Sequence, residues 1–313
     1  MCGSGGGWSR WLTLFSVINP ANRNALVGIK PTVGLTSRAG VIPESEHQDS
    51  VGVLARTVSD AALVLDSIRG VDARDNYTLA QRGRTPEDGY ARRVAGKGAL
   101  AGARFGLPWR SFWVHADADM QSQLLRLVGL IEDAGATIVN GTEITGYETL
   151  VSPDGWDWDH GVTARGRANE SEYTYVKADF HRNIEAYLSE LSNTDVRALA
   201  DIVAFNERFD GAEGGFPYAD GRGHPAFASG QDGLLAALRT GGVRDETYWQ
   251  ALGFCRGSAR RGIDDALRLG DGRRRLSGLL VPAQVAQAAQ VAAQAGYPFV
   301  TVPGGYAAES GMP

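Results

Sequence analysis

A strand, a turn-rich loop and a helix start follow one another within residues 25–62, and this order constrains the fold most strongly. Residues 25–29 form a short apolar run of the kind that builds a buried strand. The run is followed by three residues that are typical of turns, namely Pro31, Gly34 and Gly40. The segment therefore predicts a strand that leads into a long ordered loop.

The loop is expected to end at a capped helix. Thr57 can accept a hydrogen bond from the backbone N–H of Asp60 at the third helical position, and the Asp60 side chain can accept one in return, which makes a capping box. Apolar residues then continue at helical spacing until Gly70. A loop that packs against a core needs polar side chains to satisfy its backbone. The candidates for this structural role are Lys30, Ser37, Arg38, Asp49 and Arg56.

Helical patterns and apolar strand patterns alternate along the rest of the chain, which is typical of an α/β protein with a partly parallel sheet. Residues 103–107 predict a strand, 120–134 an amphipathic helix and 136–139 the next strand, which together make one βαβ unit. Further helices are predicted at 177–191, 195–207, 244–269 and 283–296, with a strand at 279–282 and surface loops at 211–233. We expect a single domain over residues 1–313.

Composition argues against several classes of function. The net charge of −5 is too small to indicate nucleic-acid binding, and 43% hydrophobic residues are typical of a soluble globular protein of the cytoplasm. No run of about 18 apolar residues occurs, so no membrane span is expected. Cys2 and Cys255 give neither a disulfide framework nor metal-ligand spacing. The cysteines therefore predict neither a disulfide nor a cysteine-ligated metal site.

A serine-containing segment lies just before the first predicted strand. It consists of Ser16, Val17, Ile18, Asn19 and Pro20, and Gly28, Ile29, Lys30, Pro31 and Thr32 follow it. This order resembles the amidase signature family, in which the serine nucleophile precedes a Val-Gly-Leu/Ile-Lys-Pro-Thr strand. Residues 175–206 and 295–313 are also similar to the family, so the resemblance covers most of the chain.

The resemblance implies both a fold and an activity. The fold would be a mixed α/β sheet flanked by helices, and it is expected to be incomplete here. The activity would be hydrolysis of carboxylic amide bonds in a small-molecule substrate, through an acyl-enzyme on Ser16 and with no metal or organic cofactor. A homo-oligomer is compatible with the resemblance, since many relatives self-associate.

The resemblance also implies partners for Ser16, namely a second serine that relays its proton and an unprotonated lysine. The nearest counterpart of the relay serine is Ser4, in a glycine-rich segment. In the family, backbone N–H groups that lead into the nucleophile form the oxyanion hole. Those groups belong here to Thr13, Leu14 and Phe15.

The catalytic lysine of the family has no counterpart in this chain. Family members carry it upstream of the nucleophile, but the fifteen residues before Ser16 include no lysine. The lysines are Lys30, Lys97 and Lys177, and Lys30 matches the family's structural lysine. Because removing the base of a nucleophile–base unit costs about 10⁴ to 10⁶ in kcat, we expect impaired activity.

We expect the chain to be truncated at both ends. The N-terminal segment with the lysine and the C-terminal strands and helices of the family have no match within residues 1–313, which would leave sheet edges unpaired. The competing interpretation is a noncatalytic amidase remnant that retains only a binding cleft. Acylation of Ser16 is the property that separates the two interpretations.

Two groups of histidine and aspartate residues suggest a third interpretation, a metal-dependent hydrolase. The first group is His115, Asp117 and Asp119, and the second is Asp157, Asp159 and His160. Asp117 and Asp119 directly precede an apolar helix, where they would instead cap the helix and complement its dipole. A separate hypothesis concerns an apolar acyl pocket lined by Trp156, Trp158 and Tyr173.

Overall fold

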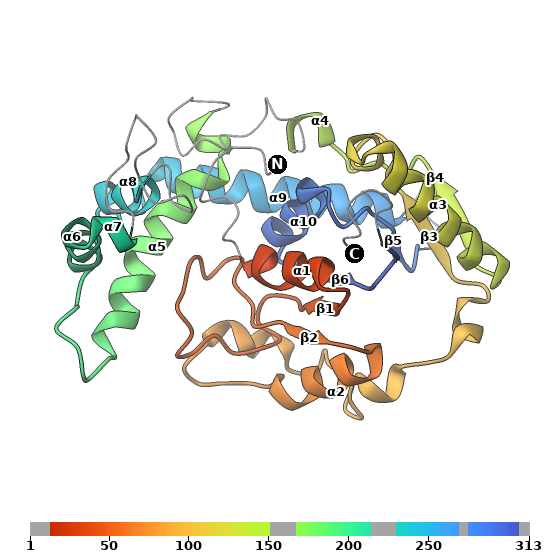
Figure 1. The fold of residues 1–313 in the computed structure, drawn as a ribbon, viewed down its shortest axis with the longest axis horizontal. Coiled ribbons are helices and arrows are strands. Elements are labelled where there is room, and N and C mark those ends of the chain that lie inside the picture. Colours follow the sequence, from red (N-terminus) through yellow and green to blue (C-terminus); the bar gives the residue numbers. More distant parts are fainter. Residues whose placement is uncertain (1–12, 151–166, 214–229, 269–274, 307–313) are drawn as a thin grey trace. The chain divides into compact units, whose positions relative to one another are not determined.

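The structure is a computed structural model that describes residues 13–150, 167–213, 230–268 and 275–306. It has a mixed α/β architecture with many helices and two three-stranded sheets (Figure 1), which confirms the predicted fold class. The chain divides into two compact units, and each is described by itself. The expectation of a single domain therefore stays a prediction.

Unit 1 comprises the described residues among 40–49 and 153–255, and unit 2 comprises those among 13–39, 50–152 and 256–313. Both sheets belong to unit 2, whereas unit 1 is built from helices and the loop at 40–49. Across the described ranges, no helix is both long and apolar enough to cross a membrane.

The first sheet of unit 2 is antiparallel and has β1 at its centre. β1 (Val27–Lys30) pairs with β2 (Val53–Ala55) on one side and with β6 (Phe299–Thr301) on the other. Helices α1 (Thr13–Arg23) and α10 (Ala286–Ala295) pack together on this sheet. Their shared cluster consists of Val17, Ile18, Ala289 and Ala293, with Phe299 of β6 against it.

Gly28 allows α1 to approach β1 closely. A Cβ atom at this position would lie 2.6 Å from the Cβ of Ala21 and 3.1 Å from Cγ2 of Thr301. Carbon atoms do not approach to 2.6 Å without strain, so a residue with a side chain would push the helix away from the strand. The glycine at 28 is therefore required by the packing of α1.

The capped helix after the long loop is α2 (Val58–Ile68). The Thr57 hydroxyl accepts the backbone N–H of Asp60 at 3.0 Å and donates to the Asp60 carboxylate at 2.7 Å, which confirms the predicted cap. Ala61 and Leu65 of α2 then pack against the first sheet through Val27 and Val53.

The second sheet of unit 2 is parallel and has the order β4–β3–β5. Its strands are β3 (Arg104–Leu107), β4 (Thr137–Asn140) and β5 (Gly278–Leu279). Helix α3 (Ala118–Asp133) connects β3 to β4, so the predicted βαβ unit is confirmed. Leu107, Trp113 and Val128 form its core, and the short helix α4 (Tyr147–Leu150) follows β4.

Unit 1 is helical. Its elements are α5 (Glu172–Ser189), α6 (Leu199–Arg208), α7 (Asp210–Glu213), α8 (Asp232–Thr240) and residues 246–255 of α9 (Glu246–Arg268). Ile184, Leu188, Leu199 and Ala237 bring α5, α6 and α8 together in one core. A second core joins α5 to α9 through Tyr175, Tyr248 and Cys255.

Two features of unit 1 differ from the sequence prediction. α5 begins at Glu172, five residues before the predicted start, because Tyr175 and Val176 are already buried against α9. The stretch at 211–233, expected as surface loops, overlaps two helices, because α7 extends to Glu213 and α8 begins at Asp232. The apolar residues of α8 pack onto α5 and α6, and this tertiary burial outweighs the nearby glycines.

Candidate active site

Helix α1 carries Ser16, the residue that the resemblance marks as the nucleophile. Ser16 is exposed, whereas the next two residues, Val17 and Ile18, are buried against α10. The helix therefore holds the serine at the surface through its buried neighbours. The residues next to Ser16 predict a strand or a loop at this position, but the structure places the serine in a helix.

The helical position has two chemical consequences for Ser16. Thr13, Leu14 and Phe15 form the first turn of α1, and N–H groups in a first turn have no acceptor within their own helix. Pro20 lies inside α1 and has no N–H, so it cannot donate the usual helical bond to the Ser16 carbonyl. The structure thus joins the proposed oxyanion donors to the serine on one helix, while their roles stay predictions.

Ser4, the predicted relay serine, lies outside the described residues. The three lysines have separate environments. Lys30 is fully buried and donates from Nζ to the carbonyl oxygen of Pro31 at 2.8 Å, as suits a structural lysine. Lys97 is exposed in the 3-10 helix Lys97–Leu100, and Lys177 places Nζ 4.5 Å from the centre of the Tyr173 ring.

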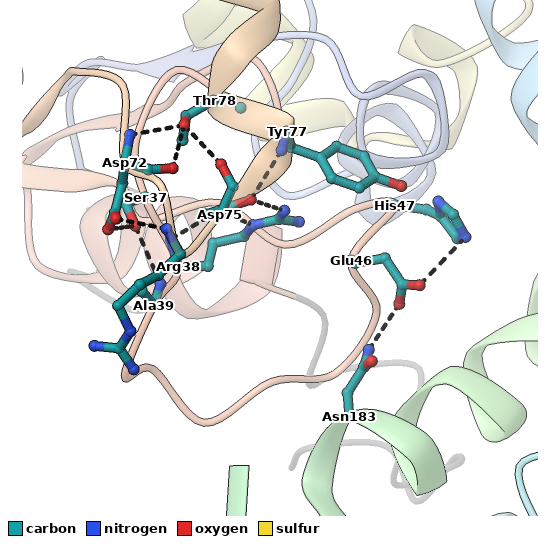
Figure 2. A network of polar contacts seen from close by, with 12 residues as sticks. Ser37, Arg38, Ala39, Glu46, His47, Asp72, Asp75, Tyr77, Thr78 and Asn183 are labelled. Carbon is teal, nitrogen blue, oxygen red and sulfur yellow. Dashed lines mark hydrogen bonds and ion pairs between the residues drawn. The ribbon is translucent and has the colours of Figure 1, made fainter. Parts of the chain in front are cut away.

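Arg38, in the loop between β1 and β2, forms a bidentate ion pair with Asp75, which follows α2 (Figure 2). Arg38 donates from Nη2 to Oδ1 at 2.6 Å and from Nε to Oδ2 at 2.8 Å, and its backbone N–H also reaches Oδ2 at 3.0 Å. Burial by itself would raise the pKa of Asp75, but the hydrogen bonds and charge of Arg38 lower it. The Arg38 guanidinium also lies 4.5 Å from the centre of the Tyr77 ring.

The neighbouring Ser37 reinforces this junction. Its hydroxyl donates to Oδ2 of Asp72 at 2.6 Å, and the Asp75 carboxylate also caps the 3-10 helix Asn76–Gln81 by accepting the N–H of Tyr77 (Figure 2). These contacts attach the loop to the segment after α2. They confirm the structural role expected for Ser37 and Arg38.

A second polar cluster lies in unit 1 around Asp179 of α5. We call Glu46, His47, Asp179, Arg244 and Tyr248 the Asp179 cluster. Oδ1 of Asp179 accepts hydrogen bonds from the Tyr248 hydroxyl and from Nη2 of Arg244, both at 2.6 Å. Its Oδ2 accepts a third from the Ser45 hydroxyl at 2.7 Å. Burial, followed by the nearby charge of Glu46, raises the pKa of Asp179 to about 6.

The remaining members of the Asp179 cluster surround its carboxylate. Nε2 of His47 lies 3.1 Å from the Tyr248 hydroxyl and 3.9 Å from Oδ2 of Asp179. Glu46 accepts a hydrogen bond from Arg244. It accepts another from Asn183 at 2.8 Å (Figure 2). Burial opposes the ionisation of Glu46, but these bonds and His47 leave its pKa below the usual value.

The Asp179 cluster has the ligand types and spacing of a metal site. Glu46, His47 and Asp179 each offer an atom within 4.8 Å of the others. Arg244, however, already donates to both carboxylates, and a divalent ion placed between them would face that positive charge. The cluster is therefore a hydrogen-bonded ion-pair network that ties the loop at 40–49 to α5 and α9, and only Nε of Arg244 in it is buried without a hydrogen-bond partner.

The metal sites suggested by the sequence do not form where the structure tests them. Asp117 caps α3 by accepting the N–H of Met120 at 2.8 Å, and Asp119 accepts from Gln123 on the same helix. In the described part of the chain, the Asp179 cluster is the group with metal-ligand spacing, and His115 does not belong to it. The helix-capping alternative is confirmed. Asp157, Asp159 and His160 lie outside the described residues, as do Trp156 and Trp158.

The mixed α/β fold of this chain is shared by known amidases. Residues 16–197 match the Amidase family model, and this match begins at Ser16. A protein of Schizosaccharomyces pombe named as an amidase is 51% identical over 92% of this chain. The chain belongs to the Amidase family.

Further relatives support this assignment. An Arabidopsis thaliana protein named as an amidase is 32% identical over 93% of this chain. The native peptide amidase of Stenotrophomonas maltophilia superposes with a TM-score of 0.66 at 29% identity and covers 95% of this chain and 55% of its own. An amidase family protein of Bacillus anthracis shares the fold, with a TM-score of 0.70 at 22% identity, over 95% of this chain and 50% of its own.

The chain spans about half the length of the relatives that it matches. The aligned part is 49% of the S. pombe protein and 49% of the A. thaliana protein. The similarity therefore covers nearly all of this sequence but not all of the fold that those relatives form.

Proposed function

We propose that the chain acts in the hydrolysis of carboxylic amides, with Ser16 as the nucleophile. The observation that carries this proposal is the exposed Ser16 directly after the first turn of α1, at the residue where the family match begins. The amidase names of the relatives at 51% and 32% identity support the same reaction class.

The proposed reaction proceeds through an ester on Ser16. Oγ attacks the amide carbonyl carbon and gives up its proton, the C–N bond breaks, and the leaving amine takes a proton. Water then cleaves the ester to release the carboxylic acid and restore the serine hydroxyl. The negative oxygen of each tetrahedral intermediate would be held by the first-turn N–H groups of Thr13, Leu14 and Phe15 and by the positive end of the α1 dipole.

The proton of Ser16 needs an acceptor. Ser4 is the proposed relay, and no lysine precedes Ser16 in this sequence. Because a nucleophile without its base loses about 10⁴ to 10⁶ in kcat, the proposal includes a low rate for this chain. A small-molecule amide substrate, a cytoplasmic location and self-association belong to the same proposal and rest on the family resemblance alone.

A noncatalytic role is the alternative, and the environments of Lys30 and Lys177 favour it. Lys30 is buried in a structural bond and Lys177 stacks on Tyr173, so each is already engaged in another contact. A protein of this kind would bind amides without cleaving them.

Release of ammonia from simple primary amides tests the proposed reaction. We expect slow release by the purified chain that is lost in Ser16→Ala and retained in Ser67→Ala, which removes an exposed serine from the helix α2 of the same unit. Amide binding without ammonia release would favour the noncatalytic alternative. Release that persists in Ser16→Ala would exclude Ser16 as the nucleophile.

A further inference from the structure

Helix α2, which lies beside β2 in unit 2 (Figure 1), carries apolar side chains that do not pack on the first sheet. Ala61 and Leu65 are buried against that sheet and account for the packing of the helix. Leu63 is 57% exposed and Val64 is 44% exposed, and Ile68, one turn after Val64, is also exposed. Apolar side chains gathered on the outside of one short helix mark an interaction surface.

Exposed arginines lie at both ends of α2. Arg56 precedes the first residue of the helix by two positions and is exposed. At the other end, Nε2 of Gln81 donates to the carbonyl oxygen of Gly70 at 2.7 Å, which attaches the 3-10 helix Asn76–Gln81 to the end of α2. Arg82 follows Gln81 directly and is exposed.

A further arginine lies beside the middle of α2. The Asp66 carboxylate of α2 accepts the backbone N–H groups of Tyr90 and Ala91, both at 2.8 Å. These bonds attach the 3-10 helix Ala91–Arg93 to α2, and Arg92 within it is exposed. Cations therefore surround α2 at its two ends and along one side. We call Leu63, Val64 and these three arginines the α2 surface.

The stretch around α2 is basic, although the whole chain has a net charge of −5. Five exposed cations of residues 56–97 have no carboxylate partner in the described part of the chain, namely Arg56, Arg82, Arg84, Arg92 and Lys97. The exposed carboxylates of the same stretch are Asp60, Glu87 and Asp88, and Asp88 already pairs with Arg93. Because positive charge is concentrated around α2, this surface favours an anionic partner.

We propose that the α2 surface docks on an anionic lipid bilayer. Leu63 and Val64 enter the boundary between headgroups and acyl chains, and the guanidinium groups contact phosphate and carboxylate oxygens of the headgroups. The cytoplasmic leaflet of a membrane carries such anionic lipids. Binding of this kind lies on the bilayer, so it needs no helix that spans it.

A second copy of this chain is a poorer partner for the α2 surface. Closed dimers are mostly two-fold symmetric, so the same residues of both copies would meet. Arg56, Arg82 and Arg92 would then lie near their own counterparts, and like charges across an interface oppose association. An anionic bilayer complements the cations and accepts the apolar side chains at the same time.

Sedimentation with vesicles tests the proposal. The purified chain is mixed with vesicles of phosphatidylcholine alone or of equimolar phosphatidylcholine and phosphatidylserine. We expect binding to the mixed vesicles that falls as salt screens the charges, and little binding to phosphatidylcholine alone. Leu63→Asp should weaken binding by about tenfold or more, because a carboxylate would face the anionic headgroups. Leu130→Asp is the matched control, since Leu130 is 58% exposed on α3 of the same unit.

A second pair of variants tests the charge. Arg92→Glu should also weaken binding by about tenfold or more, because a cation near an anionic membrane contributes about fivefold and the variant adds an anion. Arg126→Glu is the control, because Arg126 is an exposed arginine on α3. Circular dichroism checks that each variant is folded.

Several outcomes would overturn the proposal. They are no binding to the mixed vesicles, equal binding to both kinds of vesicle, and equal weakening by each variant and its control. Binding to soluble poly-L-glutamate that is as tight as binding to vesicles, and is unchanged by Leu63→Asp, would also overturn it and would assign the α2 surface to an acidic protein. A dimer of this chain that Leu63→Asp dissociates would overturn it in favour of a second copy.

Discussion

The Tyr248 hydroxyl donates a hydrogen bond of 2.6 Å to the fully buried carboxylate of Asp179, although 69 residues separate the two in sequence. The same carboxylate accepts from Arg244 and Ser45, so one residue of α5 anchors both α9 and the loop at 40–49. Burial and Glu46 nevertheless raise the pKa of Asp179 to about 6. This anchor therefore responds to pH within a range that is easily measured.

The stability contribution of Asp179 should fall as pH rises. Its pKa is about 6 in the folded protein and about 3.9 in an unfolded chain, so between these values the folded state holds more protons. The free energy of unfolding then decreases with increasing pH over this window. Urea unfolding of the wild type and of Asp179→Asn measures this free energy at pH 4.5 and at pH 7. Relative to the wild type, the variant should be more stable at pH 7 than at pH 4.5.

The expected change in the free energy of unfolding is about 1.4 kcal/mol for each unit by which the pKa differs between the folded and unfolded states. Asp66→Asn is the control, because the stability contribution of Asp66 should depend on pH in the opposite direction. Hydrogen bonds from the backbone of Ala91 and Tyr90 and from Arg69 outweigh desolvation and lower the pKa of Asp66. A pH-independent difference between the wild type and Asp179→Asn would contradict the assigned environment of Asp179.

Loss of Arg38 should destabilise unit 2 strongly. Arg38→Ala leaves the nearly buried Asp75 carboxylate without its bidentate partner, and breaking a buried pair in this way costs about 3 kcal/mol or more. Arg38→Lys should recover only part of this loss, because an ammonium group cannot make both bonds. Chemical unfolding monitored by circular dichroism gives the difference.

Arg93→Ala is the matched control for this comparison. Arg93 pairs with Asp88 at 2.9 Å, but both side chains are well exposed, so the expected loss is at most about 1 kcal/mol. Similar costs for Arg38→Ala and Arg93→Ala would show that the pair with Asp75 does not hold the loop.

Two glycine substitutions in unit 2, one between α1 and β1 and one inside α3, should have opposite effects on stability. Gly28→Ala should destabilise the protein by about 1–3 kcal/mol, because its Cβ would lie 2.6 Å from that of Ala21. Gly129→Ala should stabilise it by up to about 1 kcal/mol, because Gly129 is inside α3 with open space around it. Thermal unfolding compares the two variants.

A double variant separates steric strain from other causes. Ala21→Gly removes the atom that the new Cβ would strike, so Ala21→Gly combined with Gly28→Ala should recover part of the loss. Strictly additive costs in the double variant would rule out a direct clash between these positions.

The elements that sequence predicted well are those with local signals. The apolar run before Pro31 gives β1, the pair Thr57 and Asp60 gives the start of α2, and Asp117 gives the start of α3. In each case the deciding interaction lies within a few residues of the signal. The fold class followed from the alternation of such elements.

The elements that sequence missed depend on distant contacts or on conflicting local signals. α1 contains Pro20, which argues against a helix, yet Val17 and Ile18 are buried against α10 and hold it in place. The Asp179 cluster joins residues that lie far apart in the chain, so no spacing pattern in the sequence predicts it. Ser16 itself was found by family resemblance, since its neighbours alone give no chemical signal.

Covalent labelling of Ser16 tests the central claim most directly. The purified chain is treated with a fluorophosphonate probe, and the modified residue is identified by peptide mass spectrometry, with Ser16→Ala and Ser67→Ala as a matched pair. The account predicts a label on Ser16 that disappears in Ser16→Ala and persists in Ser67→Ala. No label on Ser16, or equal labelling of other exposed serines, would contradict a nucleophile at this position of α1.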